Sequence, residues 1–476
     1  MATLGPASNT REGIRGLIVA GANAFRLNMS HGDHGTHERI YHIIREVADE
    51  LGEPIGILAD LCGPKIRAGH FEGGSIFLVE GESVTVTTRS VMGKPGLIPS
   101  AYDALASDVI VGNRILLDDG LLELRVEAIH ETEITCTVIE GGTLKDRKGM
   151  NLPGVRVSAP SLTDKDREDA RFALEMGVDL LALSFVRRAA DIQELRDLTK
   201  ELNLPTGIIA KIEKPEALGE IDDILAAADG VMVARGDLGV ELPPEEVPAA
   251  QDSLVNRARA ADKPVIVATQ MLESMVTNSR PTRAEVSDVS HAVHSGADAV
   301  MLSAETASGA HPEGCVRMMD RIARQAESFL WKQGAFGTVT RGQPDEGPET
   351  TEHSKELQFS VGDAVARATA LISRDLLIRA IFAFTRGGTT ARVMSAARPA
   401  APLVALTGDA ANCRRMNLLW GVIPVLCEPE TSDPLRLSRE LALKLGLATP
   451  GQPILLVSGF NPDPRKELPS ITVAVA

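Results

Sequence analysis

Residues 207–241 have the sequence GIIAKIEKPEALGEIDDILAAADGVMVARGDLGVE. Two apolar runs, GIIAKI and GVMVA, flank a segment in which Leu218, Ile221 and Leu225 recur at the spacing of one helix face. Near-continuous apolar strands that alternate with amphipathic helices are typical of a parallel sheet covered on both faces. This stretch therefore predicts one strand–helix–strand unit of a parallel α/β fold.

The same alternation continues on both sides of this stretch. Further buried strands are predicted at residues 23–28, 55–60, 179–184, 264–269 and 298–303, which brings the number to seven. The segment ATLGP, at the start of the chain, would be a short eighth strand. Eight units of strand and helix close into a barrel, so we expect a (β/α)₈ TIM barrel.

Two further regions differ from the barrel in their residue pattern. Residues 66–158 contain short β-rich runs such as SVTVTT and EITCTVIEGG, separated by Gly and Asp turns, and predict a small all-β lid domain inserted into the barrel. Residues 335–355 are rich in Gly, Pro and Glu, which indicates a linker or an exposed loop. Beyond them, strands are predicted at 378–385, 401–407, 422–427 and 453–458. The expected division is a barrel of residues 1–65 and 159–334, a lid domain of 66–158, and a C-terminal α/β domain of 335–476.

The composition limits the class of protein. The chain has 476 residues and a formal net charge of −16, which disfavours a general nucleic-acid surface. Its five scattered cysteines form no CxxC pair, which disfavours disulfides and zinc knuckles and makes a reducing cytoplasm the expected location. No run of 18 apolar residues occurs, and Met1 to Thr10 lacks the pattern of a signal peptide, so neither a membrane span nor export is expected.

Nearly every predicted barrel strand ends in residues that can do chemistry. In chain order, these strand ends carry Arg26 and Asn28, Asp60, Ser184, Lys211 and Glu213, Arg235 and Asp237, Thr269, and Ser303 and Glu305. In a (β/α)₈ barrel, the active site lies at the C-terminal ends of the strands. One polar strand end is ordinary, but helix capping alone does not explain seven in register.

The residue types at these strand ends complement one another. Glu213 and Asp237 provide the hard oxygen ligands that Mg²⁺ prefers. Four cations suit phosphoryl oxygens, namely Arg26, Lys65, Arg67 and Lys211. Taken singly, Glu213 could cap the following helix and Lys211 could form an ordinary salt bridge. Together, these residues predict a metal-dependent site for a phosphorylated substrate.

These motifs resemble those of the pyruvate kinase family, in its bacterial form. The matching stretches follow the barrel and the insert in order, and they include TLGPAS (3–8), FRLNMSHG (25–32), DLCGPKIR (60–67), AKIE (210–213), ARGDLG (234–239), ATQMLESM (268–275) and MLSAETA (301–307). The resemblance is looser towards the C-terminus. It implies phosphoryl transfer from phosphoenolpyruvate to ADP, giving pyruvate and ATP in the final step of glycolysis. It also implies a cytoplasmic homotetramer that depends on Mg²⁺ or Mn²⁺.

The resemblance further implies a role for each site residue. Glu213 and Asp237 match the divalent-metal ligands, and Lys211 matches the lysine that stabilises the phosphoryl group in flight. The other substrate-binding positions are Arg26, Arg67, Thr269 and the backbone at Arg235, Gly236 and Asp237. The nucleotide-side positions are Asn28, His31, Arg67 and Lys148. Thr269 and Ser303 are both candidates for relaying a proton to the enolate, and the sequence does not distinguish between them.

A monovalent-cation site is implied in the same way. Its positions match Asn28, Ser30, Asp60 and the backbone carbonyl of Leu61, and members that need K⁺ usually carry Thr and Glu where this chain has Leu61 and Lys65. Lys65 reverses that charge and can itself supply the positive charge, whereas Leu61 offers no side-chain oxygen. We therefore expect that K⁺ is not required. The alternative is a surface role for Lys65, paired with a carboxylate of the lid.

A second anion site is predicted in the C-terminal domain. The run FAFTRGGTTARV (382–393) has the order strand, Gly-Gly, helix, and a helix N-terminus favours anions. The residues around this helix start are Thr385, Arg386, Gly387, Gly388, Thr389 and Thr390. Thr389 could simply cap the helix. With the resemblance, a site for a sugar-phosphate or nucleotide effector is the favoured interpretation.

Two other functions compete with this interpretation. A Mg²⁺-dependent barrel aldolase or lyase acting on pyruvate-like enolates would share the metal pair, but it would need neither the lid with Lys148 nor the phosphate-binding cations. A non-catalytic homologue that only binds an effector is disfavoured by the intact Lys211, Glu213 and Asp237. An assay of ADP-dependent pyruvate release separates all three.

Overall fold

Eight parallel strands form the central sheet of the molecule. In order around the sheet these are β1 (Ala2–Thr3), β2 (Ala24–Asn28), β3 (Gly56–Asp60), β12 (Leu180–Leu183), β13 (Gly207–Ile212), β14 (Gly230–Ala234), β15 (Val265–Ala268) and β16 (Ala299–Met301). A parallel bridge between Ala2 and Leu302 joins the last strand back to the first. The predicted TIM barrel is therefore confirmed, including its short first strand.

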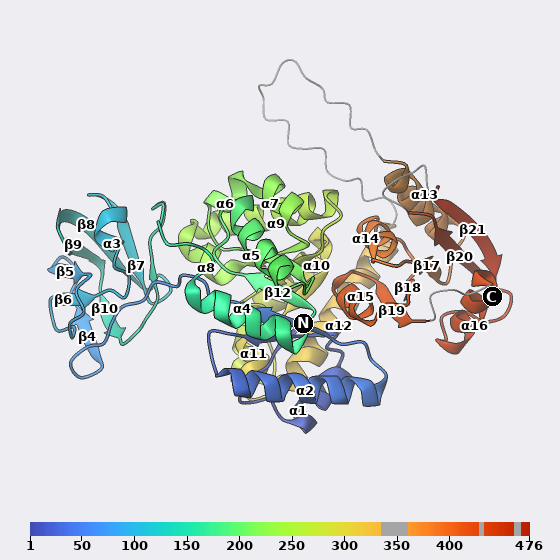
Figure 1. The fold of residues 1–476 in the computed structure, drawn as a ribbon, viewed down its shortest axis with the longest axis horizontal. Coiled ribbons are helices and arrows are strands. Elements are labelled where there is room, and N and C mark those ends of the chain that lie inside the picture. Colours follow the sequence, from blue (N-terminus) through green and yellow to red (C-terminus); the bar gives the residue numbers. More distant parts are fainter. Residues whose placement is uncertain (335–359, 428–432, 461–467) are drawn as a thin grey trace, which may run out of the picture.

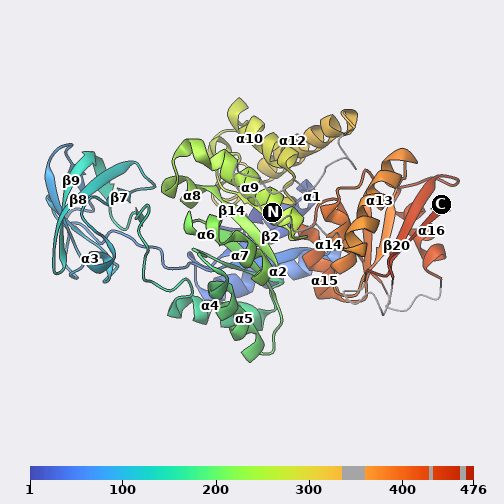
Figure 2. The ribbon, with the colours of Figure 1, turned by 90° about the horizontal axis from the view of Figure 1, so that it is seen from above.

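The computed structural model describes residues 1–334, 360–427, 433–460 and 468–476. The Gly-, Pro- and Glu-rich segment 335–355 lies outside these residues. In Figure 1, the β-rich insert, the barrel and the C-terminal α/β region follow each other along the long axis, and Figure 2 shows the same arrangement from above. No helix in the described ranges has the length and apolar character needed to cross a membrane.

Helices surround the barrel and bury the outward side chains of its strands. The longer ones are α1 (Arg11–Ala20), α2 (His34–Leu51), α4 (Asp164–Met176), α5 (Ala189–Glu201), α7 (Ile221–Ala227), α9 (Val247–Ala260), α10 (Arg283–Ser295) and α12 (Pro312–Lys332). Along β13, Ile209 points into the barrel core while Ile208 packs in the layer under the helices. Because both faces are buried, the strands are mostly apolar up to their carboxyl ends, where residues such as Asp60 and Lys211 lie.

Short helical elements follow several of the strands, and one of them, α8, carries the site residues Arg235, Gly236 and Asp237. They are α6 (Glu216–Gly219), α8 (Arg235–Glu241), α11 (Ala304–Ala307), and the 3₁₀ turns η1 (Pro244–Glu246) and η2 (Glu273–Val276). Local sequence sets several helix starts. Thr163 and Thr282, for example, form capping boxes at the starts of α4 and α10. The backbone near the strand ends is thereby fixed by neighbouring residues.

The inserted region consists of two sheets around their own core, with antiparallel strand pairs except for β5 (Ser83–Thr87) and β6 (Leu97–Pro99), which pair in parallel. A two-stranded sheet pairs β4 (Ser75–Leu78) with β10 (Gly142–Lys145). The larger sheet has the order β11 (Met150–Asn151), β7 (Arg114–Leu117), β8 (Leu122–His130), β9 (Glu133–Glu140), β5 and β6, with α3 (Leu105–Asp108) beside it. Asp118 and Asp119 turn between β7 and β8 with φ of 52° and 56°. The apolar residues of the inserted region form a core that is separate from the core of the barrel.

The C-terminal region is a five-stranded sheet in the order β19 (Val422–Leu426), β18 (Leu403–Thr407), β17 (Ile381–Phe384), β20 (Pro453–Ser458) and β21 (Ser470–Val475). The first four, which match the predicted strands, are parallel, and β21 runs antiparallel to β20. Strand β21 was not predicted, because only Ala474 of its six residues is buried. The helices here are α13 (Val361–Asp375), α14 (Thr389–Ala396), α15 (Ala410–Arg415) and α16 (Pro434–Lys444), with the turn η3 (Met416–Leu418).

Candidate active site

Lys211 lies at the centre of a buried cluster of charges at the carboxyl ends of β3 and β13. Its ammonium Nζ is 2.9 Å from Glu213 Oε1 and 3.2 Å from Asp60 Oδ1, and it donates a hydrogen bond to Ser184 Oγ at 2.6 Å. The side chains of Asp60 and Glu213 are each 1% exposed. The cluster therefore holds the lysine ammonium in one position at the mouth of the barrel.

The charge of Lys211 is fixed by its neighbours. Burial disfavours the charged form, but the carboxylates of Asp60 and Glu213 outweigh burial and raise the pKa of Lys211 above its ordinary value. Burial would likewise raise the pKa of Asp60, but Lys211 and Arg26 lower it. Lys211 is thus a permanent cation at neutral pH, suited to stabilising negative charge and not to accepting a proton.

Asp60 also orients a second cation. Its Oδ2 accepts a hydrogen bond from Arg26 Nε at 2.6 Å, while Arg26 Nη1 donates to Thr3 Oγ1 at 3.3 Å. The Arg26 side chain remains 13% exposed. One buried carboxylate therefore holds Arg26 and Lys211 side by side, although each of the two cations belongs to a different strand.

Glu213 and Asp237 form a pair of carboxylates beside this cluster. Glu213 Oε2 accepts a hydrogen bond from Phe185 N at 2.7 Å, and Asp237 lies in the first turn of α8 with 26% of its side chain exposed. Burial and the charge of Asp237 raise the pKa of Glu213, although Lys211 lowers it. A divalent cation between their oxygens would remove this repulsion, and the donors are those that Mg²⁺ prefers.

The pair would leave much of the coordination sphere of such a cation to other ligands. Among the described residues, no group of three or more carboxylate, imidazole or thiol side chains could hold a metal. Mg²⁺ typically binds through one or two carboxylates plus substrate oxygens and water, so two protein ligands suit it. The donor set therefore fits the predicted metal.

Arg235 and Thr269 are joined by hydrogen bonds across β14 and β15. The guanidinium of Arg235 is turned away from the Lys211 cluster and donates to Asp288 Oδ1 at 2.6 Å and to Thr269 O at 2.7 Å. The backbone N–H of Gly236 donates to Thr269 Oγ1 at 2.7 Å. Thr269 has a φ of 69°, which is unusual for a β-branched residue and typical of functional sites. The side chain of Arg235 therefore helps to hold the backbone at Thr269, just after the end of β15.

Lys65 reaches the metal pair. Its Nζ is 3.2 Å from Asp237 Oδ1, and its side chain is 29% exposed. The other residues of the predicted monovalent-cation site make different contacts. Ser30 N donates to Asn28 Oδ1 at 3.2 Å, and the carbonyl of Leu61 accepts a hydrogen bond from Ser184 Oγ at 2.7 Å. The observed partner of Lys65 is thus a barrel carboxylate and not a carboxylate of the lid.

One nucleotide-side residue, Asn28, is the register partner of Asp60 and so borders the Lys211 cluster, whereas Arg67 and Lys148 make other contacts. Lys148 Nζ pairs with Asp118 Oδ1 at 2.7 Å, and Arg67 Nη1 donates to Arg147 O at 3.1 Å, so both bond within the inserted region. The side chain of His31 is exposed. Ser303 lies just before α11, and its backbone N–H donates to Glu305 Oε2 at 2.6 Å.

Comparison with known proteins identifies the family. The chain matches the family model of the pyruvate kinase barrel domain over residues 1–316 and that of the pyruvate kinase alpha/beta domain over residues 363–467. The chain belongs to the pyruvate kinase family. The family resemblance expected from the sequence is thereby confirmed.

Individual pyruvate kinases are similar over nearly the whole chain. The pyruvate kinase of Geobacillus stearothermophilus is 43% identical over 462 residues, and pyruvate kinase 2 of Synechocystis is 44% identical over 465 residues. Each alignment covers 96% of this chain and 76% of the relative. The crystal structure of a pyruvate kinase from Cryptosporidium parvum matches with a TM-score of 0.88 at 36% identity, covering 99% of this chain and 94% of that one.

One buried ion pair near this site was not predicted. Lys214 Nζ lies 2.5 Å from Glu241 Oε1, which also accepts a hydrogen bond from Asn151 Nδ2 at 3.2 Å. The two charged side chains are 10% and 1% exposed. Asn151 belongs to β11, so the pair ties the inserted region to the barrel. Two features of the sequence could have suggested this pair: Lys214 directly follows Glu213, and Glu241 lies one helical turn after Asp237.

Removing one member of this pair should destabilise the protein. Lys214→Met would leave the Glu241 carboxylate buried with only an amide partner, which typically costs about 3–5 kcal/mol. We expect a lower midpoint of thermal unfolding than in the wild type. As a matched control, Lys214→Met combined with Glu241→Leu removes both charges and should recover most of the loss. Equal midpoints for Lys214→Met and the wild type would contradict the prediction.

Proposed function

We propose that this chain transfers the phosphoryl group of phosphoenolpyruvate to ADP, giving pyruvate and ATP, with Mg²⁺ or Mn²⁺ as cofactor. The observation that carries the proposal is the buried cluster of Lys211, Asp60 and Glu213, with Arg26 and Asp237 beside it. Phosphoryl transfer needs positioning and charge neutralisation more than a covalent nucleophile. A fixed ammonium, a guanidinium and two carboxylates at one barrel mouth provide that combination.

In the first half-reaction, the bond between phosphorus and the enol oxygen breaks and a bond to the terminal phosphate oxygen of ADP forms. Lys211 stabilises the charge on the transferring group, and Arg26 and Arg67 hold its oxygens. Glu213 and Asp237 would hold the divalent cation, which when bound neutralises negative charge on the substrate oxygens.

In the second half-reaction, the enolate takes up a proton at its methylene carbon. The substrate carboxylate would lie at the backbone of Arg235, Gly236 and Asp237. Because Gly236 N–H now bonds to Thr269 Oγ1, Thr269 must share or release that hydrogen bond when the carboxylate binds. Thr269 and Ser303 both remain candidates for relaying the proton.

The nucleotide positions Asn28, His31, Arg67 and Lys148 are also proposed. Lys148 and Arg67 now bond to Asp118 and to the backbone of Arg147. We infer that ADP takes over from these two acceptors, because phosphate oxygens bind ammonium and guanidinium groups strongly. The inserted region would thereby act as a lid that responds to the nucleotide.

The test is a coupled assay of pyruvate release. Purified full-length protein with phosphoenolpyruvate and Mg²⁺ should release pyruvate only when ADP is present, with one ATP formed for each pyruvate. Pyruvate release without ADP would indicate a lyase. Absence of both products would indicate a homologue without catalytic activity.

We further propose that the chain works in the cytoplasm as a homotetramer controlled by a phosphorylated effector, at the helix start formed by Thr385, Arg386, Gly387, Gly388, Thr389 and Thr390. Gly388 has a φ of 81° and precedes α14, and the hydroxyl of Thr407 and the amide of Asn412 donate to the carbonyl of Arg386. These contacts fix the backbone of the Gly-Gly turn. Sedimentation should show a tetramer.

Thr389→Glu should abolish the effect of a phosphorylated effector on the saturation curve for phosphoenolpyruvate, because it places a like charge at the anion site. Thr389→Gln is the matched neutral control and should keep the effect. Allosteric couplings are typically about 5–150-fold in affinity, which a titration of phosphoenolpyruvate at saturating effector resolves. The regulatory proposal fails if no phosphorylated metabolite shifts the wild-type curve.

A further inference from the structure

One short segment of the C-terminal region contacts the loops at the floor of the barrel. This interface segment, residues 414–417, spans the end of α15 and the start of η3. Its polar side chains reach three loops: Arg414 Nε donates to Asp179 Oδ1 at 2.7 Å, Arg415 Nη2 donates to Pro205 O at 3.0 Å, and Asn417 Nδ2 donates to Pro54 O. These loops lead into β12, β13 and β3, respectively.

The same three strands build the Lys211 cluster at their other ends. Strand β3 ends at Asp60, β12 is followed by Ser184, and β13 carries Lys211 itself. Both Asp60 and Ser184 contact the ammonium of Lys211. The interface segment therefore holds the amino ends of the strands whose carboxyl ends position the proposed charge stabiliser.

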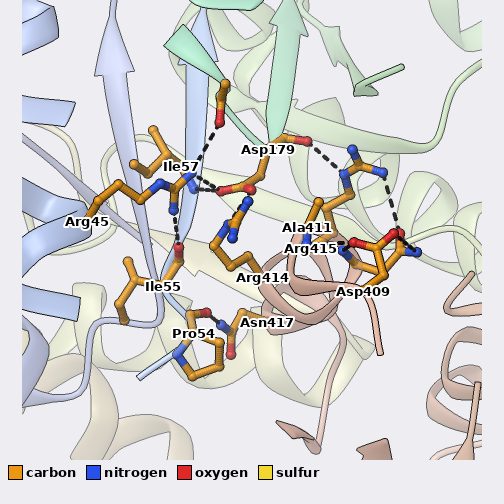
Figure 3. A network of polar contacts seen from close by, with 12 residues as sticks. Arg45, Pro54, Ile55, Ile57, Asp179, Asp409, Ala411, Arg414, Arg415 and Asn417 are labelled. Atoms are coloured by element: carbon orange, nitrogen blue, oxygen red, sulfur yellow. Dashed lines mark hydrogen bonds and ion pairs between the residues drawn. The ribbon is translucent and has the colours of Figure 1, made fainter. Parts of the chain in front are cut away.

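Asp179 is the central acceptor in these contacts, and its side chain is 1% exposed. Its Oδ2 accepts hydrogen bonds from Ile57 N and Arg45 Nη2, both at 2.8 Å, and its Oδ1 accepts the bond from Arg414. In Figure 3, the carboxylate of Asp179 lies between the two guanidinium groups. One buried carboxylate therefore joins β12 to β3 and receives one cation from the barrel and one from the C-terminal region.

The pairing of β3 with β12 connects Asp179 to the Lys211 cluster. The two strands pair up to Asp60 and Ala182. Just beyond them, Ser184 Oγ donates to Leu61 O at 2.7 Å, and it accepts a hydrogen bond from Lys211 Nζ at 2.6 Å. Closely packed strands transmit small displacements along their length. A shift of β12 against β3 at the floor would therefore move the groups that hold the ammonium.

The interface segment is itself held firmly against β3. Asp409 Oδ1 accepts hydrogen bonds from Ala411 N at 2.8 Å and Asn412 N at 3.2 Å, which caps the start of α15. A Cβ built on Gly56, the first residue of β3, would lie only 3.1 Å from Arg414 O. The backbone of the interface segment therefore packs directly on the start of β3, with little room for movement between them.

A second aspartate on the barrel floor provides a matched comparison. Asp298 precedes β16, its Oδ2 accepts a hydrogen bond from Val265 N at 3.0 Å, and its Oδ1 lies 2.9 Å from Nη1 of Arg398 in the C-terminal region. Both charged side chains are 5% exposed. Within the described residues, β16 contributes no ion pair or hydrogen bond to Lys211. Arg398 thus binds the barrel floor in the same way as Arg414, but at a strand outside the cluster.

We propose that Asp179 is a positioning residue for Lys211, and that Arg414 makes the docked C-terminal region part of this positioning. The inference rests on the proposed phosphoryl transfer and extends its machinery to the barrel floor. Without Arg414, the carboxylate of Asp179 keeps only its partners in the barrel, and β12 is no longer fixed relative to the interface segment. The ammonium of Lys211 then loses its exact position, although it keeps its charge.

The first test is steady-state kinetics of the full chain with Arg414→Met. The turnover number should fall about tenfold, since a displacement of 1 Å can cost about 10²-fold in rate. The Michaelis constant for phosphoenolpyruvate should change little, because the interaction that is lost acts in the transition state. Arg414→Lys keeps a cation for Asp179 and should recover part of the rate. Arg398→Met, the matched control, should lower the midpoint of thermal unfolding but not the turnover number.

A double-mutant cycle tests whether the effect runs through Lys211. Asp179→Asn keeps an acceptor for Ile57 N but removes the charge between the two arginines, so it should also lower the turnover number. In combination with Lys211→Met, it should lower the rate no further than Lys211→Met alone, because residues that act through one another are not additive. If Asp179 had only a structural role, the two losses would multiply.

The remaining outcomes are equally distinct. If Asp179→Asn does not fold, Arg414→Met combined with Lys211→Met completes the same cycle. The inference is wrong if Arg414→Met turns over at the wild-type rate, if Arg398→Met lowers the turnover number equally, or if the losses multiply in the cycle. A wild type that releases no pyruvate in the presence of ADP would overturn the proposed function and this inference with it, whereas the other failures leave the proposed function intact.

Discussion

Lys211→Met is expected to lower the rate of phosphoryl transfer by about 10²–10³-fold, the usual cost of losing a preorganised charge stabiliser. Binding of phosphoenolpyruvate and of the divalent metal should remain largely intact. The cluster can survive the substitution, because Asp60 keeps its bond to Arg26 and Glu213 keeps its bond to Phe185 N. The loss should therefore appear in the turnover number and not in the apparent affinities.

The measurement combines steady-state kinetics with calorimetric binding of phosphoenolpyruvate. Asp237→Asn is the contrasting variant, because it removes a metal oxygen charge and leaves the Lys211 cluster in place. We expect it to raise the Mg²⁺ concentration that gives half-maximal activity. If the Lys211 variant turned over at near the wild-type rate, the role proposed for Lys211 would be wrong.

Much of the fold could be predicted because its information is local. The runs at 207–212 and 230–234 are buried on both faces, so each shows as an apolar segment, interrupted in the first only by Lys211. The last strand, β21, could not be predicted in this way. It lies at the edge of its sheet with one buried residue of six, so its sequence lacks that pattern.

The candidate site was only partly predicted for a related reason. Lys211, Glu213 and Asp237 follow predicted strands, and parallel strands of a barrel place their carboxyl ends together. The contacts that hold them could not be predicted, because they depend on side chains from distant strands. Asp60, for example, holds both Arg26 and Lys211.

No local sequence pattern predicts where Lys148 and Arg67 of the inserted region lie relative to the barrel. Lys148 and Arg67 were assigned to the nucleotide by resemblance, but in the structure they bond within the inserted region. Their distance from the cluster depends on how the inserted region and the barrel are oriented. The buried pair of Lys214 and Glu241 at the junction with β11 is one determinant of that orientation, and it is not apparent from helix or strand periodicity.

The enzyme is expected to reach its full rate in buffer free of sodium and potassium, with a tetraalkylammonium counterion. The ammonium of Lys65 lies 3.2 Å from Asp237 Oδ1 and so already places a positive charge beside the proposed metal pair. A bound K⁺ nearby would add a second monovalent cation, and like charges repel strongly in a partly dry site. Leu61 offers only its backbone carbonyl to a cation, and Ser184 Oγ already donates to that carbonyl.

Lys65→Glu should create a requirement for K⁺. The substitution changes the local charge by two units, and unit charges about 4 Å apart interact by about 4 kcal/mol at an effective dielectric constant near 20. Since Lys65 is 29% exposed, solvent screening reduces this value, and we expect a rate roughly 10–100-fold below wild type without K⁺. Added K⁺ should restore most of the rate. Lys65→Gln, the matched neutral control, should respond to K⁺ less strongly. A wild-type enzyme that is inactive until K⁺ is added, or a Lys65→Glu variant indifferent to K⁺, would refute this role for Lys65.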